Sequence, residues 1–316
     1  MRRAQGPTPY VEAQRRENFR QTANVVLRFL NKASLMARLY PALFVFLWST
    51  GFIGAKFGIP HAEPLTFLLL RYLCVLALML PIAWLTRAPW PADAPTVFHL
   101  AISGVLIHGV YLGGVFVSLA HGLPAGIVSL LVGLQPLLTA FFATLLLKER
   151  VRPLQWVGLA LGLAGSAIVL SGRVHPAGIL AGVPTAVLAL LAITAGTLYQ
   201  KRFCPHFDWR SGASVQFLAA LIATLPVALL TEHLRVDWTG EFVFALAWLV
   251  LVLSFGAIAV LNHLIRAGSA VNVASLFYLV PPSTALIAWF AFGESFTLVQ
   301  ALGLAAAVTG VALVRR

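Results

Sequence analysis

The chain has 316 residues, of which 60% are hydrophobic and only 10% are charged, and its formal net charge is +12. A soluble domain carries about 25% charged residues, so this composition excludes a water-soluble core inside a polar shell. A mean hydropathy of +0.90 indicates a surface that faces lipid. The basic excess then marks one side of a membrane rather than a nucleic-acid-binding face. Cys74 and Cys204 are too few for a disulfide framework and lack metal-ligand spacing.

Residues 1–38 form a basic segment that differs from the rest of the chain. They contain eight Lys and Arg residues against only Glu12 and Glu17. No apolar core with a small-residue cleavage site follows Met1, so we predict a cytoplasmic tail rather than a removable signal peptide. The tail is either disordered or forms an interfacial helix around residues 19–30. Met36 leaves open that residues 1–35 precede the natural start.

Ten apolar segments follow the tail. Crossing roughly 30 Å of hydrocarbon takes about 20 apolar residues in a helix, so we predict an all-α polytopic membrane protein with ten transmembrane helices. Prolines in the first turn of several segments are compatible with helix starts, because the N–H that they lack has no partner there. The predicted helices are 39–58, 64–86, 96–119, 124–147, 153–171, 179–200, 210–230, 242–265, 270–292 and 297–314.

The distribution of basic residues predicts the orientation. With the N-terminus placed inside, 18 of the 22 Lys and Arg residues fall in cytoplasmic segments, and only Arg173 and Arg235 fall in outer loops. Lys and Arg are retained on the cytoplasmic side. We therefore expect a multi-pass protein of the cell membrane, meaning the inner or plasma membrane, with both termini in the cytoplasm.

A shift of about 145 residues aligns the two halves of the chain without a gap. It carries Pro136 to Pro281, Glu149 to Glu294 and Gly51 to Gly196. Each half contains five predicted helices, and an odd number turns the second half upside down. The loop 148–152 is basic, whereas its counterpart 293–296 has no basic residue. The halves are therefore predicted to be inverted repeats, which are typical of secondary transporters.

Several segments resemble one family. FLWSTGFIGAKFG at 46–58, PLTFLLLRY at 64–72, PAGIVSLLVGLQPLLTA at 124–140 and KERVRPLQWVGLALGLAG at 148–165 are similar to one EamA-type domain, and 267–310 is similar to the end of a second. The resemblance implies a ten-helix member of the drug/metabolite transporter superfamily, which includes amino-acid and metabolite exporters. It implies repeats at 39–171 and 172–316 but no particular substrate.

Prolines predict hinges in two repeat-equivalent helices. Pro136 lies within the fourth helix, and Pro281 and Pro282 lie within the ninth. A proline inside a helix frees a carbonyl group, which a membrane tolerates where protein or a cavity satisfies it. The alternative is a packing kink without a ligand.

Charged residues within the predicted helices are few. None of the ten Asp and Glu residues lies inside a predicted helix, which argues against a carboxylate that exchanges protons with a cationic drug. Arg71 is the most deeply placed charge, and it either faces a cavity and attracts an anion or snorkels outward. Snorkelling is the favoured interpretation for Lys56. Glu149 and Glu294 are expected to order helix junctions.

Polar and aromatic residues in the predicted helices 1, 3, 4, 6, 8 and 9 would line a central cavity if the family's fold applies. His108 and His263 either titrate near neutral pH and couple protons or only satisfy interior hydrogen bonds. Gln135 either binds substrate or caps the carbonyl freed by Pro136. With Arg71, the predicted substrate-binding residues are Trp48, His108, Tyr111, Gln135, Tyr199, Asn262, His263 and Tyr278.

Glycine stripes in the fifth and tenth helices, including Gly158, Gly165, Gly303 and Gly310, permit close helix packing. Packing within the chain is the first interpretation, and a homodimer is the second. No sequence motif of a known hydrolase, metalloprotease or ATP-driven pump is present. We therefore predict a secondary transporter that exports small metabolites such as amino acids by alternating access around a central cavity between the two repeats, with no enzymatic activity, cofactor, metal or nucleic-acid partner. The competing hypotheses are a non-transporting receptor or scaffold and, within transport, a proton-coupled drug efflux protein.

Overall fold

The computed structural model describes residues 39–51, 54–55, 57–123, 125–170, 179–292 and 297–314, and the helix bundle is built from those at Leu43 and beyond. Helices account for the regular structure of these residues, and the only extended pairing among them is an isolated bridge between Ala62 and Val236. The tail 1–38, Lys56, Glu294 and the loop 293–296 lie outside the described residues.

The first half begins with an apolar helix, Leu39–Gly51, and continues with a series of helices in which two predicted spans are subdivided. Proline stands in the first turn of α2, α3 and α6, where its missing N–H costs little. The elements are η1 (Ile59–His61), α2 (Pro64–Leu85), α3 (Ala94–Gly104), η2 (Val105–Val110), α4 (Tyr111–Ala120), α5 (Ala125–Val132), α6 (Gln135–Leu146) and α7 (Pro153–Leu170).

The second half has a similar order of helices, with a π-helix again inside the third predicted span and a division again within the fourth. The side chains of Asp208, Thr239 and Ser269 accept hydrogen bonds from backbone N–H groups at the starts of three of its helices, which supplies partners that the first turn lacks. The elements are α8 (Ile179–Phe203), α9 (Trp209–Thr231), α10 (Gly240–Trp248), η3 (Leu249–Ala257), α11 (Ile258–Ala267), α12 (Ala270–Ser275), η4 (Leu276–Leu279), α13 (Val280–Phe292) and α14 (Leu298–Val314).

Among the described residues, six helical segments are long and apolar enough to cross a membrane. Three further apolar helices are shorter, and the predicted ninth span is divided into α12, η4 and α13. The structure thus has helix at each predicted position. The count of ten transmembrane crossings stays a prediction, because four of the segments do not reach the full length as single helices.

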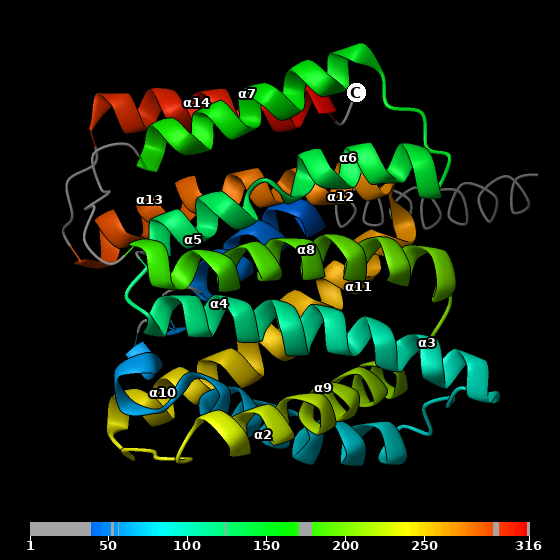
Figure 1. Ribbon diagram of the computed structural model, residues 1–316. Coiled ribbons are helices and arrows are strands. Elements are labelled where there is room, and N and C mark those ends of the chain that lie inside the picture. Colours follow the sequence, from blue (N-terminus) through cyan, green and yellow to red (C-terminus); the bar gives the residue numbers. More distant parts are fainter. Residues whose placement is uncertain are drawn as a thin grey trace, which may run out of the picture. The chain divides into compact units, whose positions relative to one another are not determined.

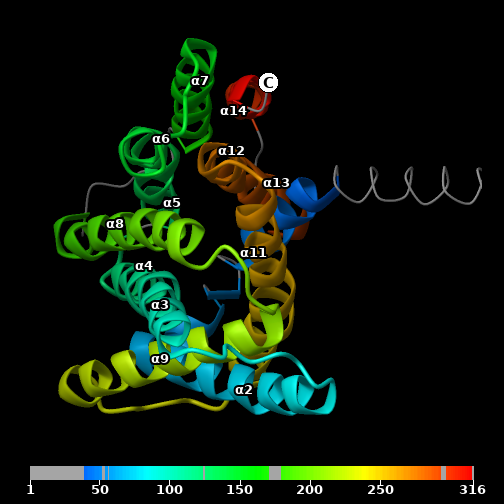
Figure 2. The ribbon, with the colours of Figure 1, turned by 90° about the vertical axis from the view of Figure 1, so that its right-hand side faces the viewer.

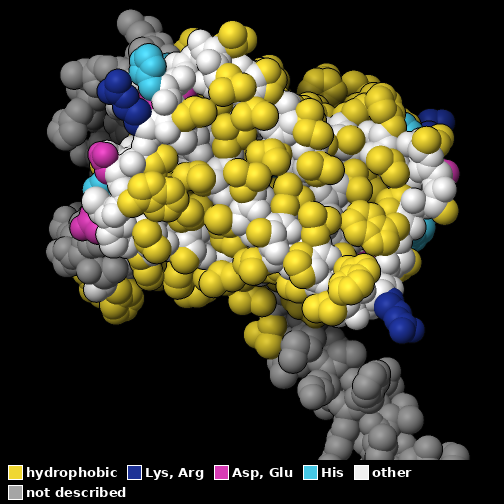
Figure 3. Space-filling model, turned by 90° about the horizontal axis from the view of Figure 1, so that it is seen from below, with side chains coloured by type: hydrophobic (Ala, Val, Ile, Leu, Met, Phe, Trp, Pro, Cys, Tyr) yellow, Lys and Arg dark blue, Asp and Glu magenta, His cyan; other side chains and the backbone are white. Residues whose placement is uncertain are grey.

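Apolar side chains cover the middle of one face of the folded part of the chain. Figure 3 shows hydrophobic side chains across the centre of one face, with Lys, Arg, Asp, Glu and His at the two ends. Leu73, Trp84, Ile222 and Leu230 are among the large apolar side chains of α2 and α9 that are exposed. Exposed apolar surface of this extent needs a lipid environment, so the structure agrees with a multi-pass membrane protein.

Repeat-equivalent helices pack against each other at two edges of the helix bundle. α2 lies beside α9, and α7 lies beside α14 (Figures 1 and 2). The second pair uses the predicted glycine stripes: an added Cβ on Gly165 would meet the Gly303 carbonyl oxygen at 2.5 Å, and one on Gly310 would meet the Gly158 carbonyl oxygen at 2.5 Å. The stripes therefore serve packing within the chain, and the homodimer stays a prediction.

Acidic residues organise the loops at the end of the bundle that holds residues 59–63. Glu232 accepts hydrogen bonds from the backbone N–H groups of Leu65 (2.8 Å) and Thr66 (2.7 Å) at the start of α2. Glu63 accepts from the N–H groups of His233 (2.9 Å) and Arg235 (3.0 Å). These backbone donors, Arg235 first, hold the pKa of Glu63 below its ordinary value. Both carboxylates thus tie the ends of α2 and α9 together.

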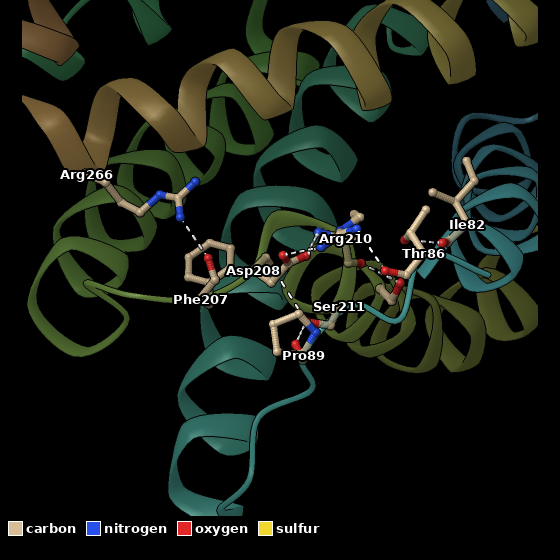
Figure 4. A network of polar contacts seen from close by, with 9 residues as sticks. Ile82, Thr86, Pro89, Phe207, Asp208, Arg210, Ser211 and Arg266 are labelled. Carbon is tan, nitrogen blue, oxygen red and sulfur yellow. Dashed lines mark hydrogen bonds and ion pairs between the residues drawn. The ribbon is translucent and has the colours of Figure 1, made fainter. Parts of the chain in front are cut away.

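A polar network joins three segments at the opposite, basic end (Figure 4). Arg210 donates from Nε (2.9 Å) and Nη2 (2.7 Å) to the carboxylate of Asp208, and this pairing lowers the pKa of Asp208. Ser211 donates to the Pro89 carbonyl oxygen at 2.6 Å. Arg266 donates to the Phe207 carbonyl oxygen at 2.7 Å, and its guanidinium lies 5.1 Å from the centre of the Phe207 ring. The network fixes the start of α9 against the ends of α2 and α11.

Candidate functional site

A small cavity lies inside the bundle between helices of the two halves. Its volume is about 50 Å³, which holds a few water molecules but no metabolite. It is bordered mainly by apolar side chains, with Arg71 and His108 as the basic groups. The described residues that line it are Trp48, Gly51, Ala55, Arg71, Ile107, His108, Tyr111, Leu112, Val115 and Phe116 from the first half, and Leu249, Leu253 and Ile258 from the second.

Arg71 on α2 is the central charged group of this cavity. Arg71 is only 3% exposed, so its side chain does not snorkel outward and its charge lies inside the protein. Its Nε donates to the hydroxyl of Ser254 at 3.1 Å. No described Asp or Glu forms an ion pair with it. Because a buried charge is costly unless it is paired, an anion bound beside this guanidinium would lower that cost, and the role of Arg71 in substrate binding stays a prediction.

Ser254 holds Arg71 and was not predicted from the sequence. Its hydroxyl accepts from Arg71 and donates to the Leu249 carbonyl oxygen at 3.1 Å. The serine lies in η3, a π-helix, in which a carbonyl group pairs with an N–H five residues later. The irregular turn places the hydroxyl beside the Arg71 Nε, where it orients the guanidinium.

Two π-helices stand at repeat-equivalent positions beside the cavity. η2 spans Val105–Val110, and the 145-residue offset carries it into η3, which spans Leu249–Ala257. Ile107 and His108 of η2 and Leu249 and Leu253 of η3 all line the cavity. π-turns inside helices occur frequently at functional sites, and here both halves contribute such a turn to the wall of one cavity.

Aromatic side chains form another wall. The rings of Trp48 and Tyr111 are nearly parallel, with centroids 6.5 Å apart and an interplanar angle of 15°. Trp48 also packs edge-on against Phe277 of η4 at 5.3 Å. The His108 ring stacks on Phe217 of α9 at 4.2 Å, and the His108 carbonyl oxygen accepts from the Tyr72 hydroxyl at 2.5 Å. Trp48, Arg71, His108 and Tyr111 are thus brought together as the sequence predicted.

A buried chain of amides runs beside this cavity and includes Asn262. Gln200 on α8 donates to the Asn262 side-chain oxygen at 2.9 Å. Gln216 on α9 donates to the Gln200 side-chain oxygen and to the Ser103 hydroxyl, both at 2.9 Å. Ser103, Gln200 and Gln216 were not predicted from the sequence. The sequence did contain a signal for Gln216, because the 145-residue offset that aligns the repeats carries Arg71 to this position.

Four other predicted site residues lie away from the cavity. Gln135 is fully buried, and neither of its amide atoms has a hydrogen-bond partner among the described residues. The Tyr199 hydroxyl pairs with the His99 Nδ1 at 2.6 Å and borders a separate cavity between α6 and α8. His263 is exposed on α11. Tyr278 is buried under Gly162 of α7. Their roles in substrate binding stay predictions.

The predicted hinge prolines follow breaks in two helices. A turn at Gly133 and Leu134 separates α5 from α6, with Pro136 in the first turn of α6. The 3₁₀ turn η4 separates α12 from α13, which begins just before Pro281 and Pro282. The two breaks are repeat-equivalent, and broken helices of this kind form sites in transporters. Hinge motion itself stays a prediction.

The sequence profile of the EamA-like transporter family matches residues 35–171 and again residues 180–316. The chain belongs to the EamA-like transporter family. The two matches agree with a two-repeat architecture and with the resemblance noted in the sequence. The protein is therefore a multi-pass membrane transporter and not an enzyme.

Relatives of this EamA-like transporter carry compatible names. It is 28% identical over 91% of its length to the "Uncharacterized inner membrane transporter YedA" of Escherichia coli, covering 92% of that protein. It is 24% identical over 85% of its length to a "Probable amino-acid metabolite efflux pump" of Salmonella typhimurium, covering 91% of that protein. A solved crystal structure with 21% identity has a similar fold, with a TM-score of 0.72 over 87% of this chain and 94% of the other.

Proposed function

We propose that this EamA-like transporter is a secondary exporter of small metabolites, such as amino acids, that works by alternating access around the Arg71 cavity. The observation that carries the proposal is the cavity itself: both halves contribute its walls, through two repeat-equivalent π-helices. The name of the Salmonella relative supports export of amino-acid metabolites. A volume of about 50 Å³ fits a conformation in which the central site is narrowed between two open states.

The alternatives are a receptor or scaffold and a proton-coupled efflux protein for cationic drugs. A scaffold has no need of a buried guanidinium that lacks a described carboxylate partner, since an apolar side chain would pack there at lower cost. Cation exchange usually depends on a carboxylate within the membrane. The seven described Asp and Glu residues all lie in loops or at helix ends, which favours metabolite transport over both alternatives.

The function is tested by an export screen. Cells that overproduce the chain and cells that carry an empty vector are grown in the same medium, and small metabolites are quantified inside and outside the cells. We expect at least one polar or amphipathic metabolite to accumulate outside the producing cells and to fall inside them. The proposal fails if no metabolite changes in this way although the protein is present in the membrane.

Cysteine labelling tests the inverted topology. In a background without Cys74 and Cys204, single cysteines are placed at Arg150 and at Ser295, which belong to repeat-equivalent loops. The positive-inside rule predicts that a membrane-impermeant thiol reagent added to whole cells labels the Ser295→Cys variant and spares the Arg150→Cys variant. Inside-out vesicles should give the opposite pattern and serve as the control. Labelling of both positions from the same side contradicts the inversion.

A further inference from the structure

We propose that the Arg71 cavity selects a small organic monoanion with an apolar body over the corresponding zwitterion, cation or neutral amide. The inference rests on the proposed function, because it concerns the same cavity, and it narrows the proposed small metabolites from amino acids to carboxylates that lack the ammonium group. It starts from charge: Arg71 is buried and pairs with a neutral hydroxyl, that of Ser254.

The other side chains that line the cavity explain the preference for an apolar body and against a positive charge. Ile107, Leu112, Val115, Leu249, Leu253 and Ile258 offer aliphatic surface, and Trp48 and Tyr111 add aromatic surface. No Asp or Glu is among the described lining residues. A carboxylate would form charge-assisted hydrogen bonds with the guanidinium. An ammonium group in the same space would meet Arg71 with no described carboxylate to compensate for a second positive charge.

Four ligands with one aliphatic skeleton test this selectivity: 4-methylpentanoate, leucine, 3-methylbutylamine and 4-methylpentanamide. Binding at pH 7 is measured by titration calorimetry on the purified full chain in detergent. Because hydrogen bonds to charged groups are the stronger ones, we expect the anion to bind about tenfold to a hundredfold more tightly than the amide and the amine. Leucine should bind more weakly than the anion.

Substitutions of Arg71 test whether its side chain causes the preference for the anion. Arg71→Gln should remove the advantage of the anion over the amide, whereas Arg71→Lys should retain part of it because the charge remains. Arg87→Gln, which removes an exposed loop charge, is the matched control and should bind like the wild type. The proposal is overturned if leucine or the amine binds most tightly, or if the anion does not bind. It is also overturned if a folded Arg71→Gln variant keeps the preference for the anion. The export screen is independent of this measurement, so failure of the substrate class and failure of transport are distinguishable.

A different observation carries a second inference, which concerns the contacts of the two broken helices. The Ser49 hydroxyl donates to the Val45 carbonyl oxygen in its own helix at 2.7 Å and also lies 3.3 Å from the Val280 carbonyl oxygen, as a second acceptor. The Thr284 hydroxyl donates to the Ser49 carbonyl oxygen at 3.4 Å. The contacts of Ser49 with Val280 and Thr284 join the first helix to α13. The 145-residue offset carries Ser49 to Thr194 and links Thr139 to Thr284. The equivalent contact would therefore join α6 to α8.

That equivalent contact is not made in this conformation. Thr194 donates to the Leu190 carbonyl oxygen in its own helix at 2.7 Å, and the buried Thr139 hydroxyl has no partner among the described residues. Gln135, one turn before Thr139, is also buried without a described partner. A cavity of about 480 Å³ lies between α6 and α8, bordered by Phe142, Leu146 and Thr194 among others.

We infer that the two contacts alternate: Ser49–Thr284 holds one side closed here, and Thr139–Thr194 forms when the other side closes. Unsatisfied buried hydroxyls are costly, and closure of α6 onto α8 would give Thr139 a partner. The gap lies at the ends of α6 and α8 near Arg202 and the basic loop 148–152. In the conformation described here, the cavity between α6 and α8 then lies on the cytoplasmic side, while the central cavity stays narrow.

Cysteine pairs test the alternation in a background without Cys74 and Cys204. Mild oxidation of membranes should cross-link Ser49→Cys with Thr284→Cys, and separately Thr139→Cys with Thr194→Cys as the molecule cycles. Phe141→Cys with Leu188→Cys, exposed positions on the same two helices, is the control pair that should stay reduced. In the variant with all four cysteines, each molecule should hold one cross-link or the other. Both cross-links in one molecule, or no cross-link at Thr139 and Thr194, overturns the inference.

Discussion

Cells that produce the Arg71→Ala variant are expected to export the metabolite found in the screen at a rate at least tenfold below that of the wild type. Arg71 is the buried cation of the central cavity, and loss of a charged hydrogen-bond partner lowers affinity by about 1.5–3 kcal/mol, or roughly ten- to a hundredfold. Initial export rates are measured at matched amounts of protein in the membrane.

A measurement of how well the Arg71→Ala variant folds distinguishes a loss of substrate binding from a loss of folding. An arginine in the middle of a membrane helix costs about 2.5–3.5 kcal/mol on insertion scales, so Arg71→Ala should insert and fold at least as well as the wild type. Arg71→Lys should retain part of the transport, and Arg87→Gln should transport normally. Wild-type export by a well-folded Arg71→Ala variant would show that the guanidinium has no role in substrate binding.

The Gly310→Ala variant is expected to unfold at a clearly lower temperature than the wild type. A Cβ at this position would lie 2.5 Å from the Gly158 carbonyl oxygen and 2.8 Å from the Gly162 Cα. These are backbone atoms of α7, which cannot rotate away, so α14 must move as a whole. Overpacking of this kind costs about 1–3 kcal/mol. Thermal unfolding of the detergent-solubilised protein, followed by size-exclusion chromatography, measures the change.

Gly113→Ala is the matched control for this prediction. It adds the same methyl group to a glycine in α4, where the nearest neighbouring atom would be the Leu65 Cδ2 at an ordinary 3.6 Å. We expect its unfolding temperature to stay close to that of the wild type. Equal unfolding temperatures for the two variants would mean that the α7–α14 contact adapts to a side chain and does not depend on glycine.

Several residues that line the central cavity could be singled out from the sequence because charge and aromaticity stand out in an apolar chain. Trp48, Arg71, His108 and Tyr111 were singled out from the sequence and line one cavity. The sequence left open whether Arg71 faces inward or snorkels, since both directions are available to a long side chain. The orientation of α2 against η3 decides this, because it places the Ser254 hydroxyl 3.1 Å from the Arg71 Nε.

The residues that the sequence did not reveal are those whose role depends on a distant partner. Ser103 and Gln216 are 113 positions apart, and neither side chain stands out until α3 and α9 pack together. Helices that are apolar on all sides give no periodic signal of which face is buried. Tyr199 and His263 were consequently predicted to line the cavity but lie beside another cavity and on the exposed surface, respectively.

By itself, the sequence determined the membrane class, the family and the internal repeat, because these depend on composition and on matches along the chain. It also predicted a hinge or a packing kink at the two equivalent proline positions, since proline cannot continue the hydrogen-bond ladder, and the structure has helix breaks just before these prolines. Only the tertiary structure decided which polar groups meet. It paired Arg71 with Ser254 and left Thr139 without a partner among the described residues, because such contacts depend on the rotation and spacing of packed helices, which an all-apolar pattern does not encode.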